Sequence, residues 1–277
     1  MRICGRFCRW DKARAGAVAE KEKNMTVQEY YKHFCEKIPA ELSLSWDNDG
    51  LMCCPDGGRT VKKILIALDI TEAVVEEAVA GGYDLILSHH PLVFRGVKSL
   101  TEKDGTGRKL LMLVKNGISA MSFHTRLDAV AGGVNDVLAQ VLGLTDVTAF
   151  GEEGIGRIGN LPAPTDDVTF AKTVKERLNA PSVKLASGKR PVSRVALLGG
   201  SGKDDVYAAL AAGADTYVTG ELAYHQLVDA PEMGLNLIEA GHFYTEYPVC
   251  RRLEEIAKEL DGSVECRILF SDAVKVL

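Results

Sequence analysis

The sequence predicts an α/β protein made of two related α/β halves. Short apolar runs typical of strands alternate with helical patterns that end at glycine, which is the rhythm of parallel βαβ units. This rhythm occurs twice along the 277 residues, and the two occurrences align without a gap. The length and the 46% hydrophobic content allow a sizeable buried core.

The expected elements follow in chain order. Thr26 and Glu29 have the spacing of a capping box, which predicts a first helix over residues 26–38. Between the two series of strands we expect glycine and proline turns and one helix, near residues 168–178. The expected strands cover 64–68, 85–87 and 118–123 in the first series, 195–198, 216–218 and 235–238 in the second, and 264–270 at the end.

Two matches indicate an internal duplication. Residues 64–90 align with 195–221 at an offset of 131 positions (195 − 64), which places His90 on Glu221. The next strand of each series then leads to a histidine followed four residues later by an acid. Any two βαβ units share strand, glycine and helix signals, so a loose similarity would carry little weight. The gapless match over 27 positions and the repeated histidine and acid favour duplication.

Net charge and the positions of glycines and prolines divide the chain into four parts. We expect a first α/β half over 25–148, a linking region over 149–189 and a second half over 190–277. Residues 1–24 carry seven basic and three acidic side chains, a net charge of +4 that leaves −9 on the rest of a chain whose total is −5. Because a capping box follows Met25, we interpret this segment as a misassigned start or a disordered extension, with a targeting arm as the alternative.

Composition argues against several functional classes. No apolar run reaches the roughly 18 residues of a membrane helix, and the first residues lack the apolar block of a secretory signal. Seven cysteines, an odd number without metal spacing, fit reduced thiols, so we expect a cytoplasmic protein. The acidic body makes a nucleic-acid partner unlikely, because duplex binding needs a basic face.

Two adjacent histidines raise the question of function. His89 and His90 follow the apolar strand residues DLIL, and Pro91 prevents the strand from continuing. Neighbouring side chains of a strand point to opposite faces, so the two imidazoles cannot both serve one core, but they can turn toward a shared point in a loop. His124 and His242 also fall at strand ends, where open α/β sheets gather their ligands.

The combination of these histidines with two acids predicts a metal site. A single histidine at a strand end is more often structural, because imidazole readily bonds a backbone carbonyl. His124 and Asp128, like His242 and Glu246, stand four residues apart where a loop turns into a helix, so each pair can converge on one ion. Nitrogen and oxygen donors of this kind suit zinc, iron, manganese, cobalt or nickel, and their number suits two divalent ions per chain bridged by a carboxylate.

The chain resembles the NGG-interacting-factor-three-like proteins, often labelled GTP cyclohydrolase I type 2 homologues. The resemblance covers nearly all of residues 25–277 and rests on five motifs, which together are highly specific. They are WDNDGLM at 46–52, SHHPLVF at 88–94, HTRLDA at 124–129, TGELAYH at 219–225 and AGHFYTE at 240–246.

The resemblance implies a ligand set and an assembly. It implies a dinuclear metal centre held by His89, His90, Asp128, His242 and Glu246, with His124 beside it. It further implies a ring-shaped homohexamer whose metal sites face an internal cavity. Longer members insert a domain between the halves, which this chain lacks.

We therefore expect a dinuclear, divalent-metal-dependent hydrolase similar to GTP cyclohydrolase I type 2, acting on a purine nucleotide or related heterocycle. Two ions would lower the pKa of a bound water toward ~7. The alternatives are a metal-dependent phosphoesterase and a non-catalytic metal-binding or regulatory hexamer. The candidate catalytic residues are Glu246, His124 and His225; His225, one helical turn after Glu221, could be an acid or base, and a structural hydrogen bond explains it equally well.

Three further features have two interpretations each. Arg95 and Lys98 could attract anionic substrate groups or be solvated loop charges. The glycine-rich turn LLGGSGKDD at 197–205 could offer amides to a phosphate, but it lacks both Rossmann and Walker spacing, and a plain turn is at least as plausible. Trp46 and the two residues after it could line a heterocycle pocket or form a buried indole with capped polar neighbours.

Overall fold

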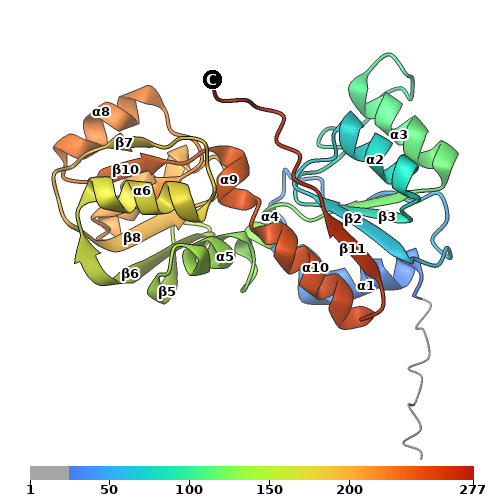
Figure 1. Ribbon diagram of the computed structural model, residues 1–277, viewed down its shortest axis with the longest axis horizontal. Coiled ribbons are helices and arrows are strands. Elements are labelled where there is room, and N and C mark those ends of the chain that lie inside the picture. Colours follow the sequence, from blue (N-terminus) through green and yellow to red (C-terminus); the bar gives the residue numbers. More distant parts are fainter. Residues whose placement is uncertain (1–24) are drawn as a thin grey trace, which may run out of the picture.

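The computed structural model describes residues 25–277, and it begins with the predicted first helix (Figure 1). Helix α1 spans Val27–Lys37. The capping box is present: the Thr26 hydroxyl accepts a hydrogen bond from the Glu29 amide, and the Glu29 carboxylate accepts one from the Thr26 amide at 2.7 Å. The expectation about residues 1–24 lies outside the described residues.

The predicted α/β fold is confirmed, with two sheets. The first sheet has five strands in the order β1-β4-β3-β2-β11. They span β1 Gly50–Cys53, β2 Lys63–Ala67, β3 Leu85–Ser88, β4 Ser119–Ser122 and β11 Glu265–Ile268. All neighbours are parallel except β1, which runs antiparallel to β4. The parallel part is the sheet predicted from the βαβ rhythm.

Both faces of the first sheet are covered by helices. Alternate residues of one strand point to opposite faces, so Ile64 and Ile66 pack on one side and Leu65 on the other. The first face meets α1 and α10 (Val249–Leu260), and the second meets α2 (Glu72–Gly81) and α3 (Gly105–Asn116). Burial on both faces explains why these strands read as continuous apolar runs in the sequence.

The second sheet has six strands in the order β5-β6-β8-β9-β10-β7, of which β8, β9 and β10 run parallel. Its strands are β5 Thr145–Phe150, β6 Gly156–Thr165, β7 Lys184–Ala186, β8 Val192–Leu198, β9 Thr216–Thr219 and β10 Asn236–Glu239. The helices around it are α5 Val134–Val141, α6 Asp167–Arg177, α7 Val206–Ala211 and α8 Tyr224–Glu232. Two short 3-10 turns, η1 (Ala40–Leu42) and η2 (Lys203–Asp205), complete the elements apart from α4 and α9.

The chain crosses between the sheets twice. Residues 149–189, expected as a link, contain β6 and β7, and both strands are hydrogen-bonded into the second sheet. The last strand, β11, instead returns to the first sheet and pairs with β2. Helices α4 (Thr125–Ala129) and α9 (His242–Glu246) lie at the boundary of the two lobes (Figure 1). The boundaries of the halves stay a prediction. Among residues 25–277, no helix combines the length and apolar character needed to cross a membrane.

The two parallel units match at the level of individual hydrogen bonds. Ile64 pairs with Leu85 in the first sheet, and Val195 pairs with Thr216 in the second, as the offset of 131 requires. In both units, an aspartate that precedes the second strand accepts hydrogen bonds from two backbone amides near the start of the first strand. The Asp84 carboxylate accepts bonds from the amides of Lys62 and Lys63, and Asp215 accepts bonds from those of Ser193 and Arg194. These equivalences support the duplication, which stays a prediction.

Candidate metal centre

Four histidines and two acids meet where the two lobes join. His89 and His90 follow β3 directly, and His124 follows β4 and precedes α4. Asp128 lies in α4, while His242 and Glu246 begin and end α9, after β10. Parallel strands end at the same edge of a sheet, so the loops after β3 and β4 bring their side chains together. The loop after β10 brings α9 from the second sheet to the same place.

The donor atoms form three overlapping groups, in each of which all ligand atoms lie within 4.8 Å of one another. The groups are His89, His90 and His124; His90, His242 and Glu246; and His89, Asp128 and Glu246. The second and third groups share only Glu246. Glu246 is therefore common to two groups of potential ligands, which share no other residue.

Each of the four histidines is held at its Nδ1 atom by an oxygen outside the cluster. The bonds join His89 to the Phe123 carbonyl oxygen at 2.9 Å, His90 to Asp69 at 2.7 Å, His124 to Asp47 at 2.9 Å and His242 to Glu221 at 2.9 Å. A carbonyl oxygen can only accept, so Nδ1 of His89 carries the proton and a neutral ring keeps its lone pair on Nε2. An outer oxygen that orients a histidine in this way is the usual companion of a metal-binding imidazole.

Two buried atoms of the cluster lack the hydrogen bond that burial normally demands. His89 Nε2 has no partner although the side chain is fully buried, and neither has Glu246 Oε2. The Nε2 atoms of His90 and His242 lie 3.0 and 3.1 Å from this oxygen, without the alignment of a hydrogen bond. Unpartnered buried donors and acceptors are costly, so atoms in this state indicate a position built for something they bind. Nitrogen and carboxylate oxygen suit a divalent transition metal.

The electrostatics of the cluster also demand positive charge. Burial lowers the pKa of His90, but Asp69 and Glu246 outweigh burial and raise this pKa to about 10. His242 behaves alike: burial lowers its pKa, and Glu246 and Glu221 raise it to about 9. Burial, and then the neighbouring Glu246, raise the pKa of Asp128 well above its usual value. Divalent ions would supply the charge that the protons of the histidines otherwise provide.

Two aspartates of the motif at 46–52 form hydrogen bonds with His124 and with the residues that follow it. The two carboxylate oxygens of Asp47 accept hydrogen bonds from His124 Nδ1 and from the amide and hydroxyl of Thr125. Asp49 accepts bonds from the His124 amide and from Arg126 Nε, at 3.0 Å. Arg126 is 1% exposed and lies over the ring of Phe123. A buried, paired guanidinium thus fixes the loop that carries His124, which gives Arg126 a structural role.

Two glycines let the second lobe approach the cluster. A Cβ atom on Gly200, which has φ +67°, would lie 2.1 Å from Glu246 Oε1 and 3.1 Å from His242 Nε2. A Cβ atom on Gly220 would lie 2.7 Å from the His242 Cα atom. Any larger side chain at either position would displace the candidate ligands of α9.

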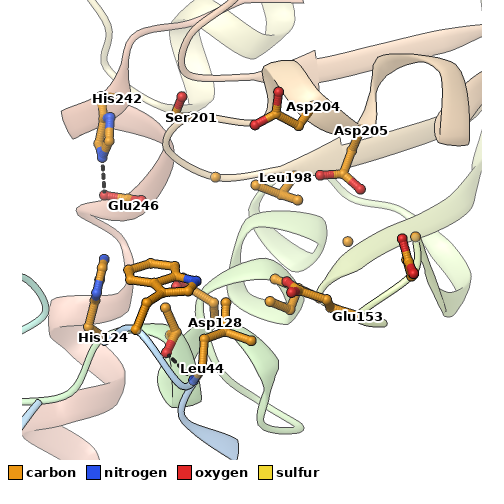
Figure 2. Close-up of a pocket in the computed structure, with 17 residues that line it drawn as sticks. Leu44, His124, Asp128, Glu153, Leu198, Ser201, Asp204, Asp205, His242 and Glu246 are labelled. Carbon is orange, nitrogen blue, oxygen red and sulfur yellow. Dashed lines mark hydrogen bonds and ion pairs between the residues drawn. The ribbon is translucent and has the colours of Figure 1, made fainter. Parts of the chain in front are cut away.

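A cavity of about 580 Å³ opens onto the cluster. Its walls include His124, Asp128, His242 and Glu246 on one side, and Figure 2 shows Glu153, Asp204 and Asp205 on the other. Trp46 lines the cavity and is 59% exposed, with its ring 6.1 Å from that of His124. The interpretation of Trp46 as part of a pocket fits this position, and the alternative of a buried indole does not.

Some residues singled out in the sequence lie elsewhere. His225 is exposed on α8, belongs to none of the three groups and has no hydrogen bond among the described residues. Glu221 bonds His242 instead. Arg95 and Lys98 are exposed and do not line the cavity. Asp69 was not predicted as part of the site. Its place directly after the apolar run of β2, at the edge of the sheet where ligands gather, was the available signal.

The glycine-rich turn after β8 uses its amides internally. Gly199 donates to the Asn135 side chain at 2.8 Å, Gly200 donates to the Thr245 hydroxyl and Gly202 to the Thr219 hydroxyl, both at 3.0 Å. The interpretation as a plain turn therefore fits better than that as a phosphate-binding loop. The turn instead braces α9, the helix that carries His242 and Glu246.

Comparison with known proteins identifies a family and a fold. The family model Duf34/NIF3 (NGG1p interacting factor 3) matches residues 25–275. The chain is 39% identical over 235 residues to a Clostridium perfringens protein named GTP cyclohydrolase 1 type 2 homolog, covering 82% of this chain and 89% of that one. A Schizosaccharomyces pombe protein named Protein NIF3 homolog is 36% identical over 223 residues, which cover 74% of this chain and 79% of its own. The crystal structure of Staphylococcus aureus hypothetical protein SA1388 matches with a TM-score of 0.83 and 28% identity, over 91% of this chain and 99% of that chain.

Proposed function

The chain belongs to the Duf34/NIF3 family, and from this membership and its site we propose that it is a dinuclear, divalent-metal-dependent hydrolase acting on a purine nucleotide or related heterocycle. The observation that carries the proposal is the sharing of Glu246 by two groups of potential ligands, together with the unpartnered Oε2 of this same carboxylate. An enzyme of this kind needs two ions close together and a cavity from which a substrate reaches them.

The residues present fit two ions. His90, His242 and Glu246 would hold one, and His89, Asp128 and Glu246 the other, so that Glu246 bridges them. His124 forms the remaining group together with His89 and His90, and it also lines the cavity. This position would allow His124 to complete a coordination shell or to exchange a proton with the substrate. Zinc, iron, manganese and nickel all accept these donors.

When bound, the two ions would supply a water acidic enough to attack near neutral pH and positive charge for the group that is attacked. The chain supplies orientation. Asp47, Asp69 and Glu221 fix the rings of His124, His90 and His242 through Nδ1, so the free Nε2 atoms face one another. Trp46 gives the cavity mouth a flat apolar wall beside His124, on which a heterocyclic ring can stack.

The test combines metal analysis and turnover. Protein purified without chelators should contain up to two divalent ions per chain, measured by elemental analysis. The loaded protein is then incubated with GTP, guanosine and a model phosphodiester, and the products are followed by mass spectrometry. Asp128→Asn should lower metal content and turnover, whereas Asp229→Asn, at an exposed position of α8, should change neither.

The products distinguish the alternatives. A ring-opened purine supports the name that the relatives carry, and phosphate or alcohol release alone supports a phosphoesterase. Protein that binds two ions yet turns over no purine or ester would contradict the hydrolase and leave the metal-binding or regulatory protein. Protein without metal after such purification would contradict both.

We also propose that the chain assembles into homohexamers. The segment after β11 supports this, because it ends with exposed apolar side chains: Val274 is 72% and Val276 55% exposed. Apolar side chains at such positions are typical of surfaces that meet another chain. Light scattering on the full chain should give six times the mass of 30.0 kDa, and a monomeric mass would contradict the proposal.

A further inference from the structure

The cavity over the metal centre has an acidic wall opposite the candidate ligands. Glu152, Glu153, Asp204 and Asp205 all line it, and none of them belongs to the three ligand groups. Figure 2 shows the last three across the cavity from His124, His242 and Glu246. They come from two segments, the turn between β5 and β6 and the 3-10 turn η2, so the fold brings them to one wall.

No lysine or arginine of the described residues balances this wall within the cavity. Among the described residues, the lining of the cavity includes neither lysine nor arginine. Arg157, the nearest guanidinium in the sequence to Glu152 and Glu153, is 6% exposed and forms an ion pair with Asp136. Burial, and then the neighbouring Asp204 and Glu153, raise the pKa of Asp205 above its usual value.

Three glycine amides of the turn after β8 are not available to a phosphate. The amides of Gly199, Gly200 and Gly202 donate to side chains of the protein and are not free for a ligand. Helix α7, which follows η2, begins behind Asp204 and Asp205, and their charge opposes the approach of an anion to its amino end. A triphosphate that reached the metals would lie against four carboxylates.

From this distribution of charge, and resting on the proposed hydrolase, we propose that the substrate is an uncharged or cationic heterocycle rich in N–H groups and free of phosphate, such as an aminopurine base or nucleoside. One end of such a molecule would face the metal centre, because His124, Asp128, His242 and Glu246 line the same cavity. The ring would stack on Trp46, and its N–H edge would donate to the carboxylates of the acidic wall.

The charge of the acidic wall makes the cavity selective. Carboxylates accept hydrogen bonds in pairs from adjacent N–H groups such as those of an amidine or a guanine edge, and they offer no donor when ionised. The same wall repels phosphate oxygens, which are acceptors with negative charge. Recognition and exclusion thus come from the same four side chains.

The experiment measures binding apart from turnover. Guanosine, GMP and GTP are titrated into the metal-loaded full chain by isothermal titration calorimetry. Guanosine should bind at least about tenfold more tightly than GTP, a difference of about 1.4 kcal/mol. In the triple variant Glu153→Gln, Asp204→Asn, Asp205→Asn, guanosine should bind more weakly and the preference should fall below about threefold.

The matched control removes the same charge at a distance. Glu76, Glu102 and Glu232 are exposed and do not line the cavity, and their joint change to Gln should leave the preference intact. GTP binding as tightly as guanosine, or equal preferences in the two triple variants, would overturn the proposal, as would the binding of none of the three ligands at millimolar concentration. Turnover is scored separately, so a preference for guanosine without any product would contradict the hydrolase and leave this selectivity standing.

Discussion

The units β2–α2–β3 and β8–α7–β9 share a frame and differ at the ends of their strands. Their strand pairs have the same register, and Asp84 and Asp215 each hold two amides at the entry of the first strand. The left-handed glycines Gly82 and Gly213 precede these aspartates at equivalent positions. The strand register and the glycine and aspartate before the second strand are thus shared by two segments whose helices differ, since α2 has 10 residues and α7 has 6.

The difference lies at the positions that face the metal centre. At the offset of 131, Asp69 corresponds to Gly200, His89 to Gly220 and His90 to Glu221. The first unit supplies two imidazoles and the acid that orients one of them, while the second supplies two glycines that make room and an acid that orients His242. The comparison teaches that the frame is independent of the chemistry, which is decided by a few residues just beyond the strands.

The largest effect should come from the residue that joins the two units. Glu246 belongs to two of the three groups of potential ligands, so Glu246→Gln should weaken metal binding by more than about 100-fold. Substitution of residues outside the ligand shell weakens metal binding by about 10 to 100-fold. The far-ultraviolet circular dichroism should stay unchanged, because α9 has only five residues. Elemental analysis after dialysis measures the loss, with Glu232→Gln on α8 as the control. Full metal content in Glu246→Gln would show that the shared carboxylate is not a ligand.

Removal of the equivalent aspartates, Asp84 and Asp215, should destabilise both units. Asp84→Ala leaves the amides of Lys62 and Lys63 without their acceptor and should lower the free energy of unfolding by about 3 to 4 kcal/mol, since Arg59 also loses its partner. Asp215→Ala should cost about 2 to 3 kcal/mol. Urea unfolding gives both values. If only one variant had a lower free energy of unfolding, the two aspartates would be equivalent in geometry but not in their contribution to stability.

The acids that orient the histidines should have a moderate effect on the metals. Asp69→Asn and Glu221→Gln should each weaken metal affinity by about 10 to 100-fold, with stability nearly unchanged. We expect the larger effect from Asp69, because its side chain is 41% exposed and bonds His90 at 2.7 Å, against 56% and 2.9 Å for Glu221. Competition with a chromophoric chelator measures the affinities. The reverse order would show that the second unit holds its imidazole more firmly.

The smallest effect should come from the glycines that end the helices. Gly82→Ala and Gly213→Ala should each lower the free energy of unfolding by about 1 to 2 kcal/mol, the cost of a left-handed conformation for alanine. No atom lies within 4 Å of a Cβ on Gly82, and only Arg194 Nε reaches 4.0 Å at Gly213, so conformation alone decides. Thermal unfolding should therefore shift by similar amounts in both variants, and metal content should not change.

The sequence predicted the parts of the fold in which local pattern and burial agree. The strands β2, β3, β8 and β9 are buried on both faces and read as apolar runs, and the capping box marked α1. The strands β1, β5, β6 and β7, which pair antiparallel with their neighbours, were missed. The residues of β5 are largely exposed, and β6 contains two prolines, so neither carries a continuous apolar signal.

The centre was predicted more completely than its surroundings. His89, His90, His124 and His242 stand at strand ends, and strand ends converge whatever the details of the loops. The partners at Nδ1 were not predictable in the same way. Asp47 and His124 are 77 residues apart, and their contact depends on how β1 joins the edge of the sheet. Pairings of that kind follow from tertiary packing, which periodicity does not report.

The return of β11 to the first sheet has a consequence for biosynthesis. The strand β2 has β11 as its outer neighbour, and the face covered by α10 receives that helix only after residue 249. During translation, the edge of β2 therefore stays unpaired and the apolar face that α10 covers stays exposed until about the last 30 residues have left the ribosome. His242 and Glu246 emerge just before them. The two groups that contain Glu246 are therefore completed only near the end of synthesis, and ribosome-associated chaperones have a defined surface to protect until then.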